Sequence, residues 1–492
     1  MSEALDTLTL QRDALASGQI SSLELVQASL DRTARCAELC LVVGTRPEAA
    51  LAEARAADER RAEGALRGPL DGLPVLLKDN MVQLGEPATC GSRILENFVS
   101  PYDGAMAEQL AEAGAVILGR TNMDEFAMGS STESSIYGPA RNPWDPERAC
   151  GGSSGGSAGA VAAGIAGAAL GSDTGGSIRQ PAAFCGVTGM KPTYGRVSRW
   201  GLVAFASSLD QIGPFAHSAR ECAWLLEAIS GHDRRDSTSI PQPSPALDAE
   251  LTGDVEGLVI GLPREYFELE GADPAVLERV REAVAELERA GARTREVSLP
   301  HTSYGIAAYY LIATAEASSN LARYDGVRYG RRAEASELDE MYRRTRSEGF
   351  GDEVKRRILL GTYVLSAGYY DAYYRKAQQV RTLLRRDFEQ AFEGCDVIAT
   401  PTSPETAFRL GEKAEDPLRM YLSDVYTVTA PLAGIPGISL PCGEVDDRPV
   451  GLQLLGPALG EAPVLRVADA YQRLTDYHER RPPEFGGLGS PR

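Results

Sequence analysis

The chain has 492 residues, of which 43% are hydrophobic, and its 69 acidic residues outnumber its 50 Lys and Arg residues to give a net charge of −19. A chain of this length and composition can bury a large core and need not be disordered. The negative charge also argues against direct binding to a nucleic-acid backbone, because that binding depends on Lys and Arg.

The beginning of the chain does not resemble a targeting segment. Residues 1–6 are partly acidic, whereas a secretory signal begins with a basic region and an apolar run, and no apolar stretch of about 18 residues occurs. The eight cysteines are scattered and form no C-x-x-C pair, which favours reduced thiols over disulfides or a metal site. We therefore expect a cytoplasmic protein with no membrane segment and no metal.

Lysine is unusually rare in this chain. Of the 50 basic residues only five are lysines, namely Lys78, Lys191, Lys355, Lys376 and Lys413. Arginine keeps its proton in proteins, whereas a buried lysine can lose its proton and act as a base. A position that needs a base therefore has to remain lysine.

The first seventy residues have the pattern of a helical layer. Residues 21–24 form a capping box, and Leu23, Val26 and Leu30 are spaced to share one helix face. From residue 70 onward, short apolar runs bounded by Gly and Pro predict strands at 73–77, 115–119, 258–262, 397–400, 438–441 and 452–456. Their alternation with helical stretches predicts an α/β fold with a large, mostly buried mixed sheet flanked by helices on both faces.

The chain reads as one domain over residues 1–481. Asp273 and Pro274 begin a helix with regularly spaced apolar residues that ends at Gly291. The Pro- and Ser-rich residues 237–253 predict a surface connection between the two halves. Residues 482–492 are rich in Gly and Pro and predict a loose tail.

Residues 150–189 differ from the rest of the chain because two clusters of Gly and Ser flank a run of small residues that predicts a helix. Glycine lets the backbone approach a ligand closely, and consecutive N–H groups can bind an anion or oxyanion. A flexible linker would not continue into a helical run or contain Asp173, Arg179 and Gln180. This stretch therefore predicts an active site.

Two common chemistries fit the stretch poorly. The phosphate-binding pattern G-x-x-x-x-G-K-[ST] is absent. Residues 151–155 match the G-x-S-x-G pattern of serine hydrolases, but residues 145–150 do not predict the strand that this pattern requires. The four histidines resemble helix-capping or surface residues: His217, His232, His301 and His478.

A lysine with a lowered pKa is the remaining way to activate a serine hydroxyl. Lys78 is the candidate, because it ends the apolar run 73–77 and thus lies at the end of a predicted strand. Lys191 is the rival base, although it lies in a predicted turn after the Gly-rich clusters. The sequence alone favours Lys78.

Three motifs resemble those of the amidase signature family in order and spacing: residues 78–80 (KDN), 151–157 (GGSSGGS) and 171–179 (GSDTGGSIR). The resemblance implies that Ser177 is the acyl-forming nucleophile and Lys78 the general base. It also implies that Ser153, after a cis peptide bond, relays the proton between them. The implied oxyanion hole consists of the N–H groups of Thr174, Gly175, Gly176 and Ser177, while Ser154, Ser157 and Ser172 are network or capping hydroxyls.

Four further stretches resemble one branch of that family, the glutamine-hydrolysing subunits of tRNA-dependent amidotransferases: residues 123–133, 191–198, 316–326 and 349–357. The resemblance covers about residues 5–480. It implies that Ser177 attacks the side-chain amide of L-glutamine and that the released ammonia converts Glu-tRNA(Gln), Asp-tRNA(Asn) or both. It further implies a B subunit that activates the aminoacyl-tRNA with ATP and Mg²⁺, a small C subunit, and no cofactor in this chain.

Selection of glutamine requires partners for its α-carboxylate and α-ammonium groups. The family positions match Arg357 for the carboxylate, with Tyr309 and Asp424 near the ammonium, and the neighbouring Arg356 and Tyr310 remain alternatives. Cys150 departs from the Pro expected in the family, and we expect activity to survive this change. A stand-alone amidase acting on small amides and a catalytically silent interaction subunit are the other hypotheses.

Overall fold

The structure is a computed structural model that describes residues 5–414 and 416–483. Its centre is an eleven-stranded sheet with the strand order β1-β3-β2-β6-β8-β7-β12-β13-β11-β9-β10. The strands of this sheet are β1 Val42–Thr45, β2 Pro74–Lys78, β3 Val116–Thr121, β6 Ala168–Asp173, β7 Thr188–Lys191, β8 Gln211–Ala216, β9 Val259–Pro263, β10 Arg293–Val297, β11 Val397–Pro401, β12 Gly437–Val445 and β13 Arg448–Leu455. The strands β4 Arg141–Asn142 and β5 Asp145–Ala149 form a separate two-stranded ribbon.

The α-helices of the described residues are α1 Leu8–Ala16, α2 Ser22–Arg35, α3 Pro47–Ala62, α4 Ala105–Glu112, α5 Gly155–Ala162, α6 Arg179–Cys185, α7 Ala219–Ile229, α8 Arg264–Phe267, α9 Pro274–Arg289, α10 Gly305–Asn320, α11 Leu338–Gly349, α12 Asp352–Val364, α13 Arg375–Phe392, α14 Pro417–Leu422, α15 Thr429–Ala433 and α16 Glu461–Leu474. None of the helices in this part of the chain is both long and apolar enough to span a membrane.

The predicted fold class is confirmed. β2 pairs in parallel with β3 and β6, whereas β6 and β8 are antiparallel, so the sheet is mixed. Val75 and Leu77 pack into a core with α4, α7 and α16, whereas Leu76 packs into a second core with α3 and α5. Because alternate residues of a strand point to opposite faces, helices cover both faces of the sheet.

The six predicted strands are confirmed as β2, β3, β9, β11, β12 and β13. The helix predicted after Asp273 is also confirmed: α9 begins at Pro274 with the Asp273 side chain as its cap, and Gly291 follows its end with φ of 105°. The predicted connection, residues 237–253, contains one short 3₁₀ turn at Asp248–Glu250. Most of the predicted tail, residues 484–492, lies outside the described residues.

The capping box at Ser21 is present, and Val26 and Leu30 of the predicted face pack into one core, while Leu23 is partly buried. Two other local predictions are wrong. The small-residue run holds the short helix α5 and then the strand β6, because tertiary pairing in the sheet outweighs the weak local preference of Ala and Gly. Residues 145–149 do form a strand, which pairs with β4 outside the main sheet and makes an isolated bridge from Arg148 to Arg409.

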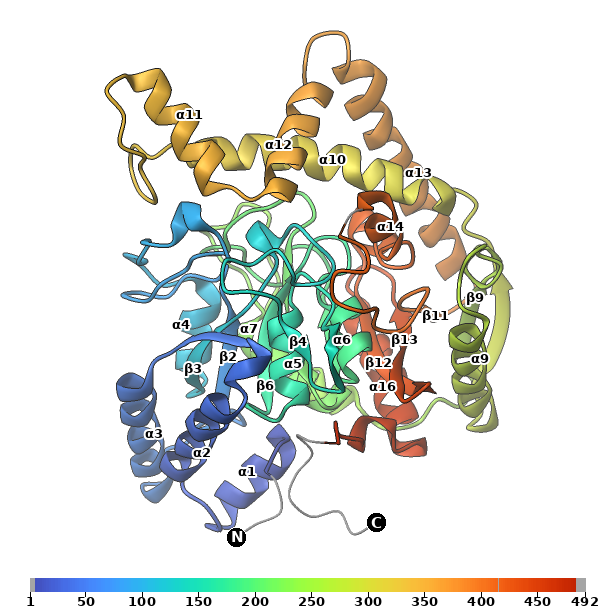
Figure 1. Cartoon of the computed structure of the whole chain (residues 1–492). Coiled ribbons are helices and arrows are strands. Elements are labelled where there is room, and N and C mark those ends of the chain that lie inside the picture. The colour runs from blue at the N-terminus through green and yellow to red at the C-terminus, as the bar shows by residue number, and fades with distance from the viewer. Residues whose placement is uncertain (1–4, 415, 484–492) are drawn as a thin grey trace.

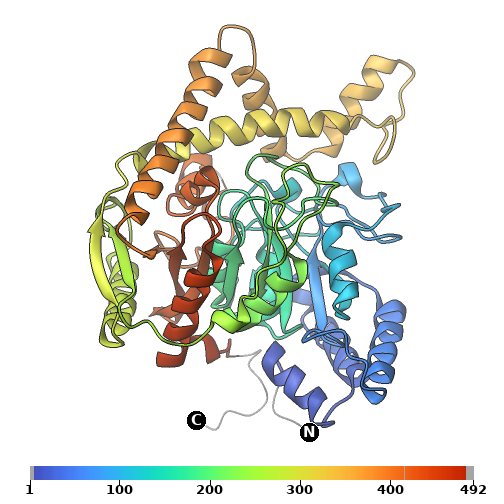
Figure 2. The same cartoon turned by 180° about the vertical axis from the view of Figure 1, so that it is seen from behind.

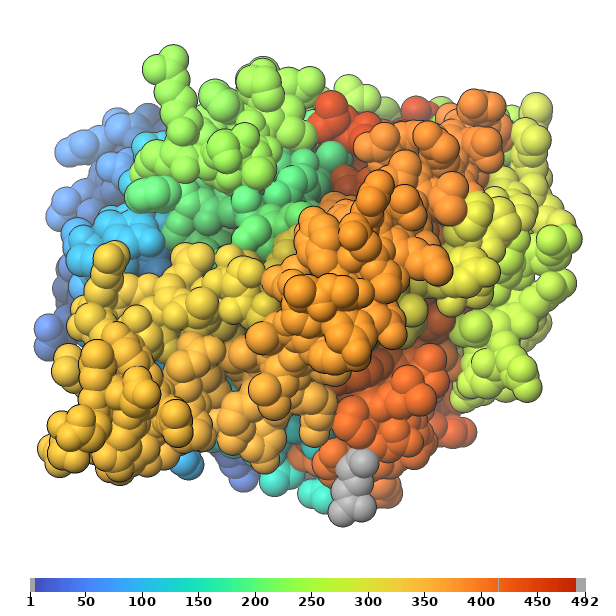
Figure 3. Space-filling model, turned by 90° about the horizontal axis from the view of Figure 1, so that it is seen from above, coloured from blue at the N-terminus to red at the C-terminus, as the bar shows by residue number. Residues whose placement is uncertain are grey.

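A layer of helices lies over the end of the sheet where β2 and β6 finish (Figure 1). Helices α10 to α13 form this layer in both side views (Figure 1, Figure 2) and dominate the upper face in Figure 3. The aromatic and aliphatic residues under the layer form a separate core that includes Tyr309, Ile312 and Phe350. The predicted site residues come from both sides of this boundary, because Lys78 ends β2, whereas Tyr309 belongs to α10 and Arg357 to α12.

Candidate functional site

Lys78 is the last residue of β2 and is fully buried. Its Nζ atom lies 2.7 Å from Oγ of Ser153, 2.9 Å from Oγ of Ser154 and 3.0 Å from Oγ of Ser172. Burial lowers the pKa of Lys78 to about 7, although the carboxylates of Asp124 and other buried acids oppose this shift. An amine with a pKa near neutrality can accept a proton from a neighbouring hydroxyl.

Ser153 follows a cis peptide bond, as predicted. The N–H group of Gly152 donates to Oε1 of Gln180 at 2.9 Å, and the carbonyl of Ser153 accepts from the N–H of Asp124 at 3.2 Å. A Cβ atom at Gly152 would lie 2.1 Å from Oδ2 of Asp124, so only glycine fits there. The Ser153 loop is therefore held from two sides.

Asp124 supports this loop from residues 123–133, one of the stretches that carried the family resemblance. Its carboxylate accepts hydrogen bonds from the N–H groups of Thr132 at 2.9 Å and Ser131 at 3.2 Å and from Oγ of Ser134 at 3.0 Å. These donors satisfy a carboxylate that would otherwise be costly to bury. Sequence reasoning assigned no role to Asp124, because its partners are defined only by the folded loop.

Ser177 lies in the turn between β6 and α6, and Asp173 organises this turn. The Asp173 carboxylate accepts from the N–H groups of Gly176 at 2.9 Å and Ile178 at 3.2 Å, and it forms a buried ion pair with Arg179 at 3.0 Å. No described residue forms a hydrogen bond with Oγ of Ser177, so this hydroxyl is unengaged. The structure therefore joins Lys78 to Ser153, while no hydrogen bond joins Ser153 to Ser177.

The predicted oxyanion donors differ in their availability. Because the N–H of Gly176 already donates to Asp173, it is occupied, whereas no described residue accepts from the N–H groups of Gly175 and Ser177. Oγ1 of Thr427 donates to the carbonyl of Gly175 at 2.7 Å, and Oγ1 of Thr174 donates at 2.7 Å to a buried carboxylate directly before β8. These bonds fix both sides of the turn.

The rival lysine has different surroundings. Lys191 is buried, and burial lowers its pKa to about 7, as for Lys78. Its Nζ donates to the carbonyl of Pro192 at 2.8 Å, and no serine hydroxyl of the described chain lies within hydrogen-bond distance. Geometry rather than pKa therefore distinguishes the two lysines.

The arginines proposed for the substrate carboxylate are clearly distinct in the structure. The side chain of Arg357 on α12 is 4% exposed, and that of Arg356 is 44% exposed. Nε of Arg357 donates to Glu353 at 2.8 Å, and its guanidinium lies over the rings of Tyr310 and Tyr421. Nη1 and Nη2 of Arg357 have no hydrogen-bond acceptor among the described residues, which leaves them available to a carboxylate.

The two neighbouring tyrosines also separate. Tyr309 lies against the turn of Ser177. A Cβ atom added at Gly175 would be only 2.6 Å from the hydroxyl oxygen of Tyr309. Tyr310 instead stacks on Tyr421, with ring centroids 4.0 Å apart. Tyr309 is thus the tyrosine beside the nucleophile turn.

Asp424 follows α14 and is buried. Its Oδ2 atom accepts a hydrogen bond from Oγ of Ser130 at 2.8 Å. Burial raises the pKa of Asp424 to about 7, although Ser130, Arg357 and Lys413 all favour its charged form. A buried carboxylate and a buried guanidinium therefore lie close enough to influence each other in one site.

Two predictions about single residues have separate outcomes. His217 is not a surface residue: it is buried directly before the cap of α7, and its N–H donates to Glu221 at 3.1 Å. Cys150 is buried, and its carbonyl accepts from the thiol of Cys185 at 3.4 Å. The effect of Cys150 on activity stays a prediction.

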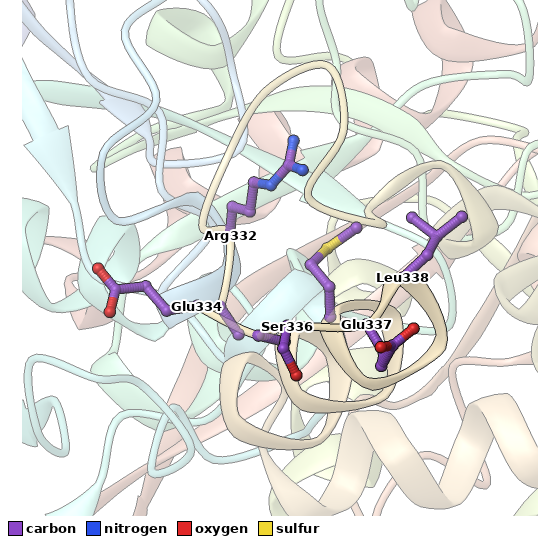
Figure 4. A pocket seen from close by; sticks show the side chains of 8 residues that line it. Arg332, Glu334, Ser336, Glu337 and Leu338 are labelled. Carbon is purple, nitrogen blue, oxygen red and sulfur yellow. The ribbon is translucent and has the colours of Figure 1, made fainter.

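One surface pocket lies away from these residues. It has a volume of about 450 Å³ and is formed by the loop before α11 (Figure 4), where Arg332, Glu334, Ser336, Glu337 and Leu338 line it. None of the predicted site residues lines this pocket.

A mixed α/β sheet with helices on both faces and a buried lysine among serine hydroxyls defines a large enzyme fold with a serine-based site. The family model described as Amidase matches residues 24–465, and the chain belongs to this family. The predicted family and the predicted amidase class of enzyme are therefore confirmed.

Individual relatives indicate which branch of the family this chain resembles. A protein of Moorella thermoacetica, named as the A subunit of Glutamyl-tRNA(Gln) amidotransferase, is 60% identical over 471 residues, which are 96% of each chain. A protein of the same name from Chloroflexus aggregans is 57% identical and covers 97% of this chain and 98% of its own. The predicted resemblance to the tRNA-dependent branch is confirmed by these relatives.

Solved structures agree with the fold. The crystal structure of the Glutamyl-tRNA(Gln) amidotransferase A subunit from Thermotoga maritima has a TM-score of 0.76 at 44% identity, covering 92% of this chain and 91% of that one. The peptide amidase of Stenotrophomonas maltophilia has a TM-score of 0.81 at 32% identity, and the match covers 98% of this chain and 99% of that one. One architecture therefore serves both kinds of amidase.

Proposed function

We propose that this chain is the glutaminase subunit of a tRNA-dependent amidotransferase. The observation that carries the proposal is the contact of 2.7 Å between Nζ of the buried Lys78 and Oγ of Ser153, which lies two residues before α5. The names of the similar proteins support the reaction class.

In the proposed reaction, neutral Lys78 takes the proton of Ser153, and Ser153 takes the proton of Ser177. Oγ of Ser177 then attacks the side-chain carbonyl of L-glutamine, and the N–H groups of Gly175 and Ser177 stabilise the oxyanion. The proton returns through Ser153 to the leaving nitrogen, which departs as ammonia. Water then hydrolyses the Ser177 ester and releases glutamate.

The recognition of glutamine follows from charge. Arg357 offers two free nitrogen donors to the α-carboxylate, and Asp424 offers a carboxylate to the α-ammonium. The hydroxyl of Tyr309 lies beside the turn that carries the nucleophile. A site with buried charges of both signs rejects amides that lack the matching groups.

Ammonia has to reach an acceptor that this chain does not activate. The sequence contains no phosphate-binding loop and carries a net charge of −19, so we assign the binding of tRNA, ATP and Mg²⁺ to a B subunit, with a supporting role for a C subunit. We propose no cofactor for this chain and place the complex in the cytoplasm. The partner decides whether Glu-tRNA, Asp-tRNA or both are amidated.

A glutamine analogue with an electrophilic γ-carbon tests the proposal. After incubation with the full chain, mass spectrometry is expected to find one adduct on Ser177 and none after Ser177→Ala. A stand-alone amidase would instead release ammonia from simple amides with no response to the B subunit. Labelling of another residue, or no labelling with or without the partner subunits, would overturn the proposed function.

A further inference from the structure

The described residues between β11 and α15, 402–414 and 416–428, form the segment that contains Asp424. Near its beginning it is fixed to the ribbon, where the N–H of Ala149 donates to the carbonyl of Phe408 at 3.0 Å. Near its end the hydroxyl of Tyr421 donates to a carboxylate of α12 at 2.8 Å. The two contacts fix the segment on both sides of Lys413, and Asp424 follows the second contact by three residues.

Lys413 connects the two ends of this segment from within. Its ammonium donates to Oγ of Ser423 at 2.6 Å, forms an ion pair with Glu405, and lies 4.2 Å from the centroid of the Phe408 ring. The residue is 2% exposed. One buried cation thus links residues 405 and 408 to the residue directly before Asp424.

We infer that Lys413 is a positioning residue that holds Asp424 in place for the α-ammonium group of the substrate. The inference rests on the proposed function, because only a substrate with an ammonium group makes use of Asp424. It adds a specificity determinant outside the Lys78 network. Lys413 itself does not touch the substrate in this account.

The choice of lysine at this position is informative in a chain so rich in arginine. Three of the five lysines are buried, namely Lys78, Lys191 and Lys413. Lys355 is partly exposed, and Lys376 is exposed. A compact ammonium can donate to a hydroxyl and a carboxylate while its stem packs on a ring, whereas the wider, planar guanidinium needs more room. The crowding around this ammonium explains why arginine has not replaced the lysine.

Electrostatics give Lys413 a second effect on Asp424. Its charge is one of those that oppose the rise in the pKa of Asp424 caused by burial. Loss of this charge would leave Asp424 both less well placed and less fully ionised. Both changes weaken the binding of an ammonium group and leave the binding of a carboxylate unaltered.

Lys413→Met is the variant that tests this inference. Methionine keeps the packing on Phe408, and Glu405 is 34% exposed, so water can solvate its carboxylate after the ion pair is lost. We therefore expect the variant to fold, with a melting temperature close to that of the unchanged chain. Ser423→Ala removes the hydrogen bond alone and provides a second test.

The readout is the inhibition constant of two competitive product analogues, measured with the full chain in complex with its partner subunits. L-glutamate carries the α-ammonium, and glutarate lacks it. For Lys413→Met we expect the inhibition constant of L-glutamate and the KM of glutamine to rise at least fivefold. The inhibition constant of glutarate and kcat should change less than twofold, and Lys376→Met, at an exposed lysine, should change nothing.

Parallel increases for L-glutamate and glutarate, or no change for either, would overturn the role of Lys413. The role of Lys413 would also be overturned if Ser423→Ala left both the inhibition constant of L-glutamate and the KM of glutamine unchanged. These results differ from a failure of the proposed function, in which the unchanged chain neither hydrolyses glutamine nor reacts with its electrophilic analogue.

Discussion

The Nζ atom of Lys78 lies 2.7 Å from Oγ of Ser153, and both side chains are fully buried. Two further hydroxyls, of Ser154 and Ser172, surround the same amine, and Oγ of Ser154 donates to the carbonyl of Ser172 at 3.1 Å. Ser154 is therefore an acceptor towards Lys78. Ser153 remains able to give its proton to the amine.

Replacing Lys78 tests this proton transfer. We expect Lys78→Met to lower kcat about 10²- to 10⁴-fold, which is the usual contribution of a general base. Lys78→Arg should fail in the same way, because arginine cannot become neutral. Steady-state ammonia release measures both effects.

Lys191→Met is the matched control, since it removes a buried lysine with a similarly lowered pKa that contacts no serine hydroxyl of the described chain. Its kcat should stay within tenfold of that of the unchanged chain. If Lys191→Met abolished turnover while Lys78→Met kept it, the assignment of the base would be reversed.

The pH dependence of kcat/KM should rise from acid to alkaline pH. Lys78 works as a base only above its pKa of about 7, and Asp424 binds an ammonium only above its own pKa of about 7. Below pH 7 both groups are protonated, so log(kcat/KM) should rise with a slope approaching two before it levels off. Initial rates between pH 5.5 and 9 give this profile.

Asp424→Asn removes one of the two titrating groups and should reduce the limiting slope to one. Circular dichroism at each pH controls for unfolding. A profile that is flat across pH 7, or that falls as pH rises, contradicts the neutral-lysine mechanism.

Local features of the site could be predicted from the sequence, because they depend on neighbouring residues. Lys78 ends an apolar run that forms β2, and the Gly-rich turn around Ser177 follows a strand. In the Ser153 loop, the missing side chain of Gly152 permits the close approach of the backbone to Asp124. Strand ends and glycine turns can be predicted because each depends on residues that are consecutive in the sequence.

Contacts between distant segments could not be predicted. The bond of Thr427 to Gly175 joins residues 252 positions apart, and no local pattern marks it. The choice between Arg356 and Arg357 depends on the rotation of α12 against Tyr310, which packing alone decides. The sequence does not predict β6, because Ala, Gly and Ser have little intrinsic preference for strands.

The buried ion pair of Asp173 and Arg179 should matter for stability. Asp173→Asn places an amide among donors and leaves Arg179 without its counter-charge, which costs about 3–5 kcal/mol for a buried pair. Urea unfolding of the full chain measures this loss. Asp145→Asn removes a partner of Arg148 at a half-exposed site and should cost less than about 1 kcal/mol. If both variants lowered the free energy of unfolding equally, the buried ion pair would contribute no more to stability than the half-exposed one.

Arg357 and Asp424 should separate the two ends of the substrate. A hydrogen bond to a charged group contributes about 1.5–3 kcal/mol, so Arg357→Met is expected to raise the KM of glutamine about 10- to 100-fold. The fold should tolerate this change, because Glu353 keeps its ion pair with Arg356.

Product analogues identify which end is lost. Arg357→Met should raise the inhibition constants of both L-glutamate and glutarate, whereas Asp424→Asn should raise only that of L-glutamate, since glutarate has no ammonium group. Arg356→Met removes an exposed neighbour and should leave the KM of glutamine within twofold. If Arg356→Met weakened binding and Arg357→Met did not, the carboxylate site would lie on the outer face of α12, and the buried arrangement around Arg357 would serve packing alone.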